Sequence, residues 1–198
     1  MDDANGQLTI LSDVNYAATS EHVYLWGVMI PHADPASFQL LTYPYSRDSK
    51  RAYCGTVPMR DANPASIKVL GGQLDPSFVS RAEAYEILVG PITTVSSDSA
   101  IIGALGWSAD EDTVFFGPNP IMGARPQSFR LLNDLYATDG SSVFFGREKL
   151  ERADPETFRV VNFTSAEDRN YTYKRAEATK RSDRTQNGQE KPKAIRRE

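Results

Sequence analysis

The chain has 198 residues, of which 40% are hydrophobic and 10% aromatic, with a formal net charge of −4 at pH 7. This is the composition of an ordinary folded protein, and the length favours a single domain. No apolar run approaches the roughly 18 residues that cross a bilayer, and acids stand where a secretory signal carries positive charge. We therefore expect a cytoplasmic protein, or a periplasmic one if a signal peptide was removed, that does not bind a membrane. The single Cys54 excludes an internal disulfide framework.

Charge is divided unevenly along the chain. Residues 174–198 contain nine basic residues against four acids, a balance of +5, whereas residues 1–173 contain 13 basic and 22 acidic residues, a balance of −9. We expect the basic tail, 174–198, to be disordered, because it has almost no apolar residues to bury. The acidic body disfavours nucleic acid as a partner and favours a basic protein surface, because long-range fields steer association.

A pattern of about 29 residues recurs four times, in 16–41, 45–70, 107–132 and 136–161. Each copy opens on an aromatic residue, which is followed by a polar turn, a second aromatic eight residues later, a Gly and a Pro. Tyr136, Phe144, Gly146 and Pro155 show the spacing most clearly. In the first copy the Gly comes one place late, as if Trp26 were inserted. The alternating residues 7–11 precede the first copy and predict a strand of a truncated unit.

Three short strands are expected in each copy. The first ends in the polar turn, of which Asp139-Gly140 is the strongest hairpin signal. The second is rich in aromatic and β-branched residues, which favour strands, and ends at the Gly. A loop then leads through Ala-x-Pro to a third strand. One bulky apolar position precedes that strand in every copy: Phe38, Ile67, Phe129 and Phe158.

Residues 71–106 interrupt the pattern between the second and third copies. Apolar residues recur at nearly helical spacing after Pro76, which predicts one helix over 76–88. After the fourth copy, Phe163 and Tyr171 are again eight residues apart and predict a half-unit that caps the stack. The predicted fold is therefore mostly β: a single domain over 1–173, built from about four three-strand units that form either a curved sheet or a solenoid.

Several acidic residues invite comparison with metal ligands. The turns at 108–113 and 138–142 are rich in oxygen, but neither has the spacing of a calcium loop, and we interpret both as polar hairpin turns. Asp34, Asn63 and Asp154 each precede a Pro. We expect each of these side chains to accept a hydrogen bond from a backbone N–H just past the Pro. Neither a metal nor a cofactor is predicted.

Catalytic signatures are weak. Cys54, His22 and His32 are the only residues that could form a thiol and imidazole pair, and Cys54 aligns with bulky apolar residues, which predicts a buried structural role. Neither a nucleophile elbow nor a phosphate-binding loop occurs, so we expect no enzyme. Paired aromatics such as Phe115-Phe116 project to opposite faces of a strand; we favour burial in a core over an exposed binding row.

The repeated unit resembles the DKNYY repeat family. The residues that carry the resemblance are Asp139, the stretch 143–146 and the phrase Ala-Asp-Pro-Glu-Thr-Phe at 153–158. The other copies match more loosely: Thr19 replaces the turn Asp, and Arg125 replaces the Asp before Pro. The resemblance implies a bacterial β-repeat protein and brings no catalytic residues with it.

Together these features predict a non-enzymatic protein-binding module, and more specifically a bacterial immunity protein that occludes a cognate toxin with a basic surface. The immunity hypothesis rests on the acidic body and on analogy with DKNYY-like proteins of toxin and immunity loci. Glu111 and Asp112 are candidates to meet Lys and Arg of the toxin, and Trp26 is a candidate aromatic anchor because it departs from the repeat. The alternative is a cell-surface or periplasmic structural module that binds glycan or peptidoglycan through exposed aromatics.

Overall fold

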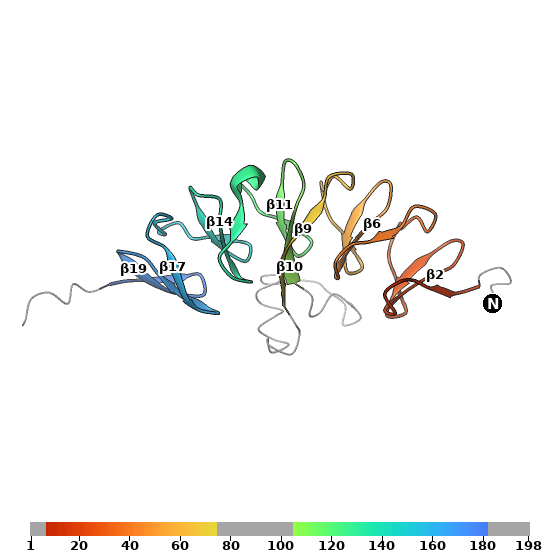
Figure 1. The fold of residues 1–198 in the computed structure, drawn as a ribbon, viewed down its shortest axis with the longest axis horizontal. Helices are drawn as coiled ribbons and strands as arrows, with labels where there is room; N and C mark the ends of the chain where they lie inside the picture. Colours follow the sequence, from red (N-terminus) through yellow and green to blue (C-terminus); the bar gives the residue numbers. More distant parts are fainter. Residues whose placement is uncertain (1–6, 75–104, 182–198) are drawn as a thin grey trace, which may run out of the picture.

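The computed structural model describes residues 7–74 and 105–181, which form five small antiparallel sheets of four strands each. The sheets stand one after another in chain order and build an arc (Figure 1). Within the described ranges there is no α-helix, and the one helical element is the 3₁₀ turn η1, Pro126–Ser128. The prediction of a mostly β fold is confirmed.

We call the five sheets units 1 to 5. Unit 1 contains β1 (Thr9–Ile10), β2 (Tyr16–Ala18), β3 (Val23–Leu25) and β4 (Val28–Met29). Unit 2 contains β5 (Gln39–Leu40), β6 (Tyr45–Arg47), β7 (Ala52–Cys54) and β8 (Val57–Pro58). Unit 3 contains β9 (Lys68–Leu74), β10 (Leu105–Ala109), β11 (Val114–Phe116) and β12 (Asn119–Pro120). Unit 4 contains β13 (Arg130–Leu131), β14 (Tyr136–Thr138), β15 (Val143–Phe145) and β16 (Glu148–Lys149). Unit 5 contains β17 (Arg159–Asn162), β18 (Ser165–Glu167), β19 (Tyr171–Lys174) and β20 (Glu177–Lys180).

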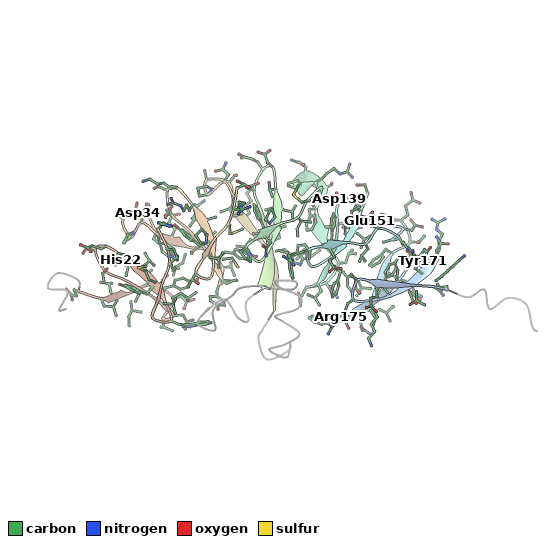
Figure 2. All side chains as sticks on the ribbon, turned by 180° about the vertical axis from the view of Figure 1, so that it is seen from behind. His22, Asp34, Asp139, Glu151, Tyr171 and Arg175 are labelled. Atoms are coloured by element: carbon green, nitrogen blue, oxygen red, sulfur yellow. The ribbon has the colours of Figure 1, made fainter. Side chains whose placement is uncertain are left out.

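Every unit is a meander whose strands pair in chain order. The turn between its second and third strands therefore lies at one edge of the arc, which we call the hairpin edge. The other described turns of each unit lie at the opposite edge. Figure 2 shows this division: Asp139, in a hairpin-edge turn, and Arg175, between β19 and β20, lie on opposite sides of the arc.

The units differ from the predicted repeats in two ways. The third strand expected at the end of each copy is present, but it pairs with the following copy; in unit 2, for example, Leu40 pairs with Ser46. A fourth strand follows the Gly, because the Gly lies in a two-residue turn and the chain returns, as in the pairing of Cys54 with Val57. The structure thus has five separate four-stranded sheets where the sequence predicted about four three-strand units.

The C-terminal end of the folded part was predicted too early. Residues 174–180 were assigned to a disordered tail, yet Lys174 ends β19 and β20 follows, with Tyr173 paired to Ala178. These residues are ordered because Ala176 and Ala178 pack against the core of the neighbouring units. The predicted half-unit is a complete fifth sheet, and residues 182–198 of the predicted tail lie outside the described residues.

The interruption between the second and third copies lies within unit 3. β9 continues to Leu74 and β10 begins at Leu105, so both ends of the 71–106 segment belong to a sheet. The two strands pair from Lys68 with Ala109 to Leu74 with Leu105. The helix predicted over 76–88 lies outside the described residues and stays a prediction.

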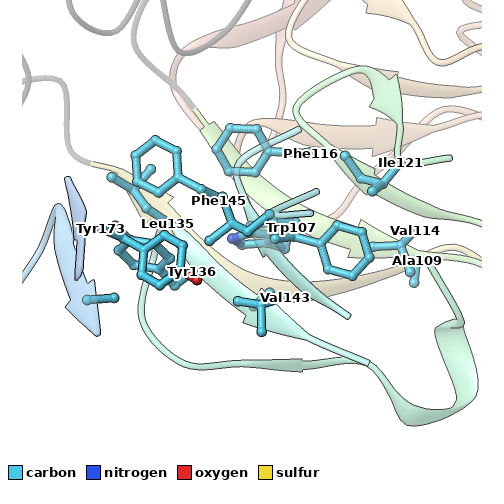
Figure 3. Packing of buried hydrophobic residues seen from close by; sticks show 14 residues of the cluster. Trp107, Ala109, Val114, Phe116, Ile121, Leu135, Tyr136, Val143, Phe145 and Tyr173 are labelled. Atoms are coloured by element: carbon cyan, nitrogen blue, oxygen red, sulfur yellow. The ribbon is translucent and has the colours of Figure 1, made fainter. Parts of the chain in front are cut away.

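The core runs along the arc between the sheets rather than inside any one of them. Phe115 and Phe116 are adjacent and point to opposite faces of β11, yet both are fully buried because units 2 and 4 cover the two faces. Figure 3 shows the packing around Trp107 between units 3 and 4. The expectation that paired aromatics form a core is confirmed. Each such buried side chain contributes about 2 to 3 kcal/mol of hydrophobic stabilisation.

Candidate functional site

A buried Asp follows the second strand of units 2 to 5. These residues are Asp48, Asp110, Asp139 and Asp168. One carboxylate oxygen of each accepts the backbone N–H groups two and three residues later; in unit 4 these are Ser141 at 2.9 Å and Ser142 at 2.8 Å. The Asp therefore closes the hairpin-edge turn. In unit 1 Thr19 takes this position, and its hydroxyl accepts the N–H of His22 at 3.0 Å.

The second carboxylate oxygen of the same Asp reaches the preceding unit's loop. Asp48 accepts the N–H of Asp34 at 3.1 Å, and Asp168 accepts the N–H of Asp154 at 3.0 Å. Asp110 does the same for Asn63 across the 71–106 interruption, at 2.8 Å. The Asp is thus a link between successive units as well as a turn residue.

The surroundings of Asp48, Asp139 and Asp168 favour the ionised carboxylate. Burial alone would raise the pKa of Asp48, but the donors around it outweigh this and hold the pKa below its usual value. One of these donors is the Tyr53 hydroxyl, 2.7 Å away; Tyr173 donates to Asp168 at the same distance. The pKa of Asp168 and that of Asp139 are lowered in the same way, with burial opposed by several hydrogen bonds. The sequence pattern identified this Asp as structural but did not reveal that it links one unit to the next. The Asp recurs every 29 residues in units 3 to 5, and this regular spacing was a signal of such a link.

The residues before Pro behave as predicted. The carboxylate or amide oxygens of Asp34, Asn63 and Asp154 accept N–H groups two residues later, at 3.1, 3.0 and 3.1 Å. These are local turn contacts, which use the oxygen atoms that a cation would need. Among the residues described in the structure, no group of three or more His, Cys, Asp and Glu could hold a metal ion.

The opening aromatic of each copy ties its unit to the next. Tyr45 donates its hydroxyl to the carbonyl of Gly106 at 2.5 Å, and Trp107 donates its indole N–H to the carbonyl of Asp134 at 2.8 Å. Tyr136 reaches the carbonyl of Thr164 at 3.0 Å in the same manner. In unit 5 the equivalent position is Ser165. The repeated aromatic and acidic residues are therefore engaged in stacking the units.

Cys54 is buried in the core between units 2 and 3, beside Tyr45 and Ala52. Burial raises the pKa of its thiol to about 12, so the thiol is neutral at physiological pH. His22 is exposed in a hairpin-edge turn, and His32 uses its carbonyl to accept the Tyr53 hydroxyl at 3.2 Å. The prediction that Cys54 is a buried structural residue is confirmed.

Glu111 and Asp112 lie exposed in the hairpin-edge turn of unit 3, at the middle of the arc. Neighbouring loops hold this turn on both sides. The side-chain amide of Asn63 donates to a carboxylate oxygen of Glu111 at 2.7 Å, and the side-chain amide of Gln127 donates to its carbonyl at 2.9 Å. The two acids are therefore presented on a braced turn.

Trp26 lies in the β3–β4 turn of unit 1, at the edge opposite to Glu111 and Asp112, and unit 2 stands between. It is 48% exposed and leans on Tyr43, with ring centroids 5.8 Å apart. The structure does not bring the three predicted partner-binding residues together.

Trp26 is also not an insertion. Its N–H donates to the carbonyl before β2, as the N–H groups of Gly55, Gly117, Gly146 and Arg175 do in the other units. Trp26 therefore occupies the position that is Gly in units 2 to 4. Trp26 and Gly27 both have positive φ, 50° and 79°, as in a type I′ turn, which needs its Gly at the second position.

Charge is nearly balanced over the described part of the chain. Residues 7–74 and 105–181 contain 17 acidic and 16 basic residues, a balance of −1. Four of the acids are the buried link residues, and four basic residues lie in and beside β19 and β20 at one end: Lys174, Arg175, Lys180 and Arg181. The described units therefore have acidic patches rather than the overall negative charge expected for the body. The turn at Glu111 and Asp112 is one such patch.

The five units, the buried Asp and the stacked aromatics repeat along nearly the whole described chain. The model of the DKNYY family matches residues 16–177. The chain belongs to the DKNYY family. The match begins at the opening aromatic of unit 1 and ends at Glu177, the first residue of β20, so it extends to the beginning of the strand that the sequence had left to the tail. No curated protein and no solved structure matched this DKNYY chain. None of the helices in the described ranges is long and apolar enough to cross a membrane.

Proposed function

We propose that this DKNYY protein is a non-enzymatic protein-binding module, and that it acts in the bacterial cytoplasm as an immunity protein that occludes a toxin with a basic surface. The observation that carries the proposal is the braced turn at Glu111 and Asp112. Both carboxylates are exposed, and the loops of both neighbouring units hold Glu111: Asn63 contacts its carboxylate and Gln127 contacts its backbone carbonyl. A preorganised acidic turn loses little conformational freedom when it meets Lys or Arg of a partner.

The structural role of the other repeated residues agrees with a binding function for the exposed loops. The buried Asp residues and the opening aromatics serve the contacts between units, and exposed loops are left to vary at both edges of the arc. Stacked repeats of this kind present extended surfaces to partners. The partner would contact the hairpin edge of unit 3 and the adjoining loops at Asn63 and Gln127.

Trp26 gives weaker support for a separate contact at the opposite edge. A Trp at a φ of 50° costs about 1 to 2 kcal/mol relative to the Gly of units 2 to 4. Residues kept in such a conformation are concentrated at functional sites. Because Trp26 lies far from Glu111 along the arc, a small partner would use one of the two places.

The glycan-binding alternative has less support. It required a row of exposed aromatics, and the aromatic rows of units 2 to 5 are buried between the sheets. In the described ranges the most exposed of the large aromatic residues are Trp26 and Phe163, which are isolated from each other in units 1 and 5.

The test is a pull-down from lysate of the source cell with the full chain as bait, followed by co-expression of any captured protein with the chain. We expect one basic protein in a complex that high salt weakens, and loss of its toxicity on co-expression. Capture of no protein, together with retention of the chain by insoluble cell-wall material, would overturn the proposal in favour of the glycan-binding alternative.

A matched pair of variants locates the contact. Glu111→Gln combined with Asp112→Asn removes two charges from the braced turn and keeps its size; we expect protection to fall at least about tenfold, which corresponds to about 1.4 kcal/mol. Glu148→Gln removes an exposed charge from β16 at the other edge and serves as control. Equal protection by all three forms would exclude the unit 3 turn as the site.

A further inference from the structure

The two ends of the arc differ in chemistry. In units 2 to 5, one row of cross-strand neighbours faces the preceding unit. From the first strand to the fourth, its residues follow one pattern: aliphatic, small, aromatic and variable. In unit 2 the row is Leu40, Ser46, Tyr53 and Pro58. In unit 4 it is Leu131, Ala137, Phe144 and Lys149. Tyr53 and Phe144 are fully buried in the clusters that join their units to the preceding ones.

Unit 1 has the same row, with no unit before it in the described chain. The row consists of Ile10, Ala17, Tyr24 and Met29. Ile10 is 64% exposed and Met29 47% exposed, whereas the equivalent residues in later units are at least half-buried or polar. Leu8, two residues before Ile10, adds further exposed apolar surface. We call this surface the N-face.

Unit 5 is capped differently. The face that it turns away from unit 4 carries Ser165, Lys174 and Thr172 in place of Tyr136, Phe145 and Val143 of unit 4. Arg159 and Arg181 form ion pairs with Glu167 on the same sheet. A polar outer face of this kind ends a stack of repeats. Among the described residues at this end Val161 and Phe163 are also exposed, but the row that would meet an N-face is polar, so this end complements the N-face less well than a second N-face does.

We propose that the N-face is the interface of a symmetric dimer, in which two copies of this chain pack unit 1 against unit 1. The row is neutral and self-complementary. A two-fold axis that lies in the interface, parallel to the strands and between β2 and β3, reverses the order of the row. It places Tyr24 of one copy over the small Ala17 of the second copy, and Ile10 over Met29.

Large residues then meet small ones, as a closed isologous contact requires. The contact continues the stacking that joins units 1 to 5, with the same row positions buried on both sides of the axis. It buries apolar side chains and no ion pair, so salt does not weaken it, in contrast to the toxin complex proposed for Glu111 and Asp112.

The first test is the molar mass of the full chain by light scattering after size exclusion. We expect twice the chain mass of 22.0 kDa, independent of salt. Ile10→Lys combined with Met29→Lys places charges in the apolar contact and should weaken association at least about 100-fold, giving monomers with an unchanged circular dichroism spectrum. Met122→Lys is the control, because Met122 is 84% exposed in a loop of unit 3 and outside the N-face.

A second test reports the axis. Chains with Ile10→Cys mixed with chains with Met29→Cys should form disulfide-linked pairs on oxidation, whereas Ile10→Cys chains alone should not. Efficient cross-linking of Ile10→Cys chains alone would overturn the stated packing. A wild-type chain that stays at 22.0 kDa, a mass that grows with concentration beyond two copies, or a dimer that survives both lysines would overturn the interface itself.

Discussion

Asp139 shows how one carboxylate does two tasks in this fold. One oxygen accepts the N–H groups of Ser141 and Ser142 in its own turn, and the other accepts the N–H of Arg125, at 3.2 Å, in the loop that precedes unit 4. The side chain is almost completely buried. Its removal would leave three part-buried N–H groups without this acceptor, at a cost of about 1 kcal/mol or more each.

Asp139→Ala should therefore lower the free energy of unfolding by about 3 kcal/mol, and Asp139→Asn by about half as much, because the amide keeps one acceptor oxygen. Urea unfolding at neutral pH measures both values. Asp112→Ala is the control: it removes an exposed Asp from the equivalent kind of turn and should change stability by less than about 0.5 kcal/mol. A loss below about 1 kcal/mol for Asp139→Ala would contradict the link role.

The link residues also predict the response to acid. Although burial opposes it, hydrogen bonding holds the pKa of Asp139 below its usual value in the folded chain, and the pKa values of Asp48 and Asp168 are lowered likewise. The ionised forms therefore stabilise the fold above the unfolded-state pKa of about 3.9, and this stabilisation is lost as pH falls through the lower folded values. Urea unfolding between about pH 6 and pH 2 should show falling stability and a shrinking difference between wild type and Asp139→Asn. A difference that stays constant down to the lowest pH would show that the charge of Asp139 does not contribute.

At the scale of the element, the Gly after the third strand decides where the fourth begins. Gly146 has a φ of 52°, and a Cβ added there would lie 3.2 Å from the Phe116 ring of unit 3. This turn is therefore a point of close approach between two units as well as a left-handed position. Gly140, in the hairpin-edge turn of the same unit, has a φ of 85° and nothing within 4 Å of such a Cβ.

Comparing Ala at these two positions separates backbone strain from packing. Gly140→Ala should cost about 1 kcal/mol, which is the left-handed penalty alone. Gly146→Ala should cost about 2 to 3 kcal/mol, because it also displaces the Phe116 ring in a close-packed core. Thermal or urea unfolding of the two variants gives the difference. Equal costs would mean that Phe116 moves without penalty.

The strands on either side of such a turn differed in how well the sequence predicted them. Aromatic and β-branched residues at fixed spacing predicted strands such as β14 and β15, because a half-buried strand needs these side chains. The two-residue strand β12, Asn119–Pro120, has no such residues and was interpreted as loop. Its existence depends on the pairing of Phe115 with Pro120 across the turn, a contact that composition does not report.

Strand partners were harder to predict than strands. β5 follows the loop of the first copy in sequence and belongs to the sheet of the second, because the short Leu41–Pro44 connection turns it antiparallel to β6. The candidate site met the same limit. Spacing identified Glu111 and Asp112 as turn residues, but the braces from Asn63 and Gln127 join loops far apart in the chain.

At the scale of the whole molecule, the stack behaves as a one-dimensional array in which each unit contacts its neighbours. Units 3 to 5 share one cluster of 14 buried residues, whereas the cluster between units 1 and 2 contains six. Unit 1 also has its N-face exposed within a single chain. Local opening should therefore begin at unit 1 and become more costly toward unit 4.

Hydrogen exchange measured by mass spectrometry tests this gradient, in the Ile10→Lys and Met29→Lys chain so that dimerisation does not protect unit 1. We expect the amides of β2 and β3 to exchange first and those of β14 and β15 last. Leu25→Ala, in the small cluster, should speed exchange in units 1 and 2 alone, although such a substitution costs about 2 to 5 kcal/mol. Phe144→Ala, in the large cluster, should speed exchange throughout units 3 to 5. Uniform exchange in all five units, changed equally by both substitutions, would instead mean that the arc unfolds as a single cooperative body, and the difference in cluster size would then have no consequence for local stability.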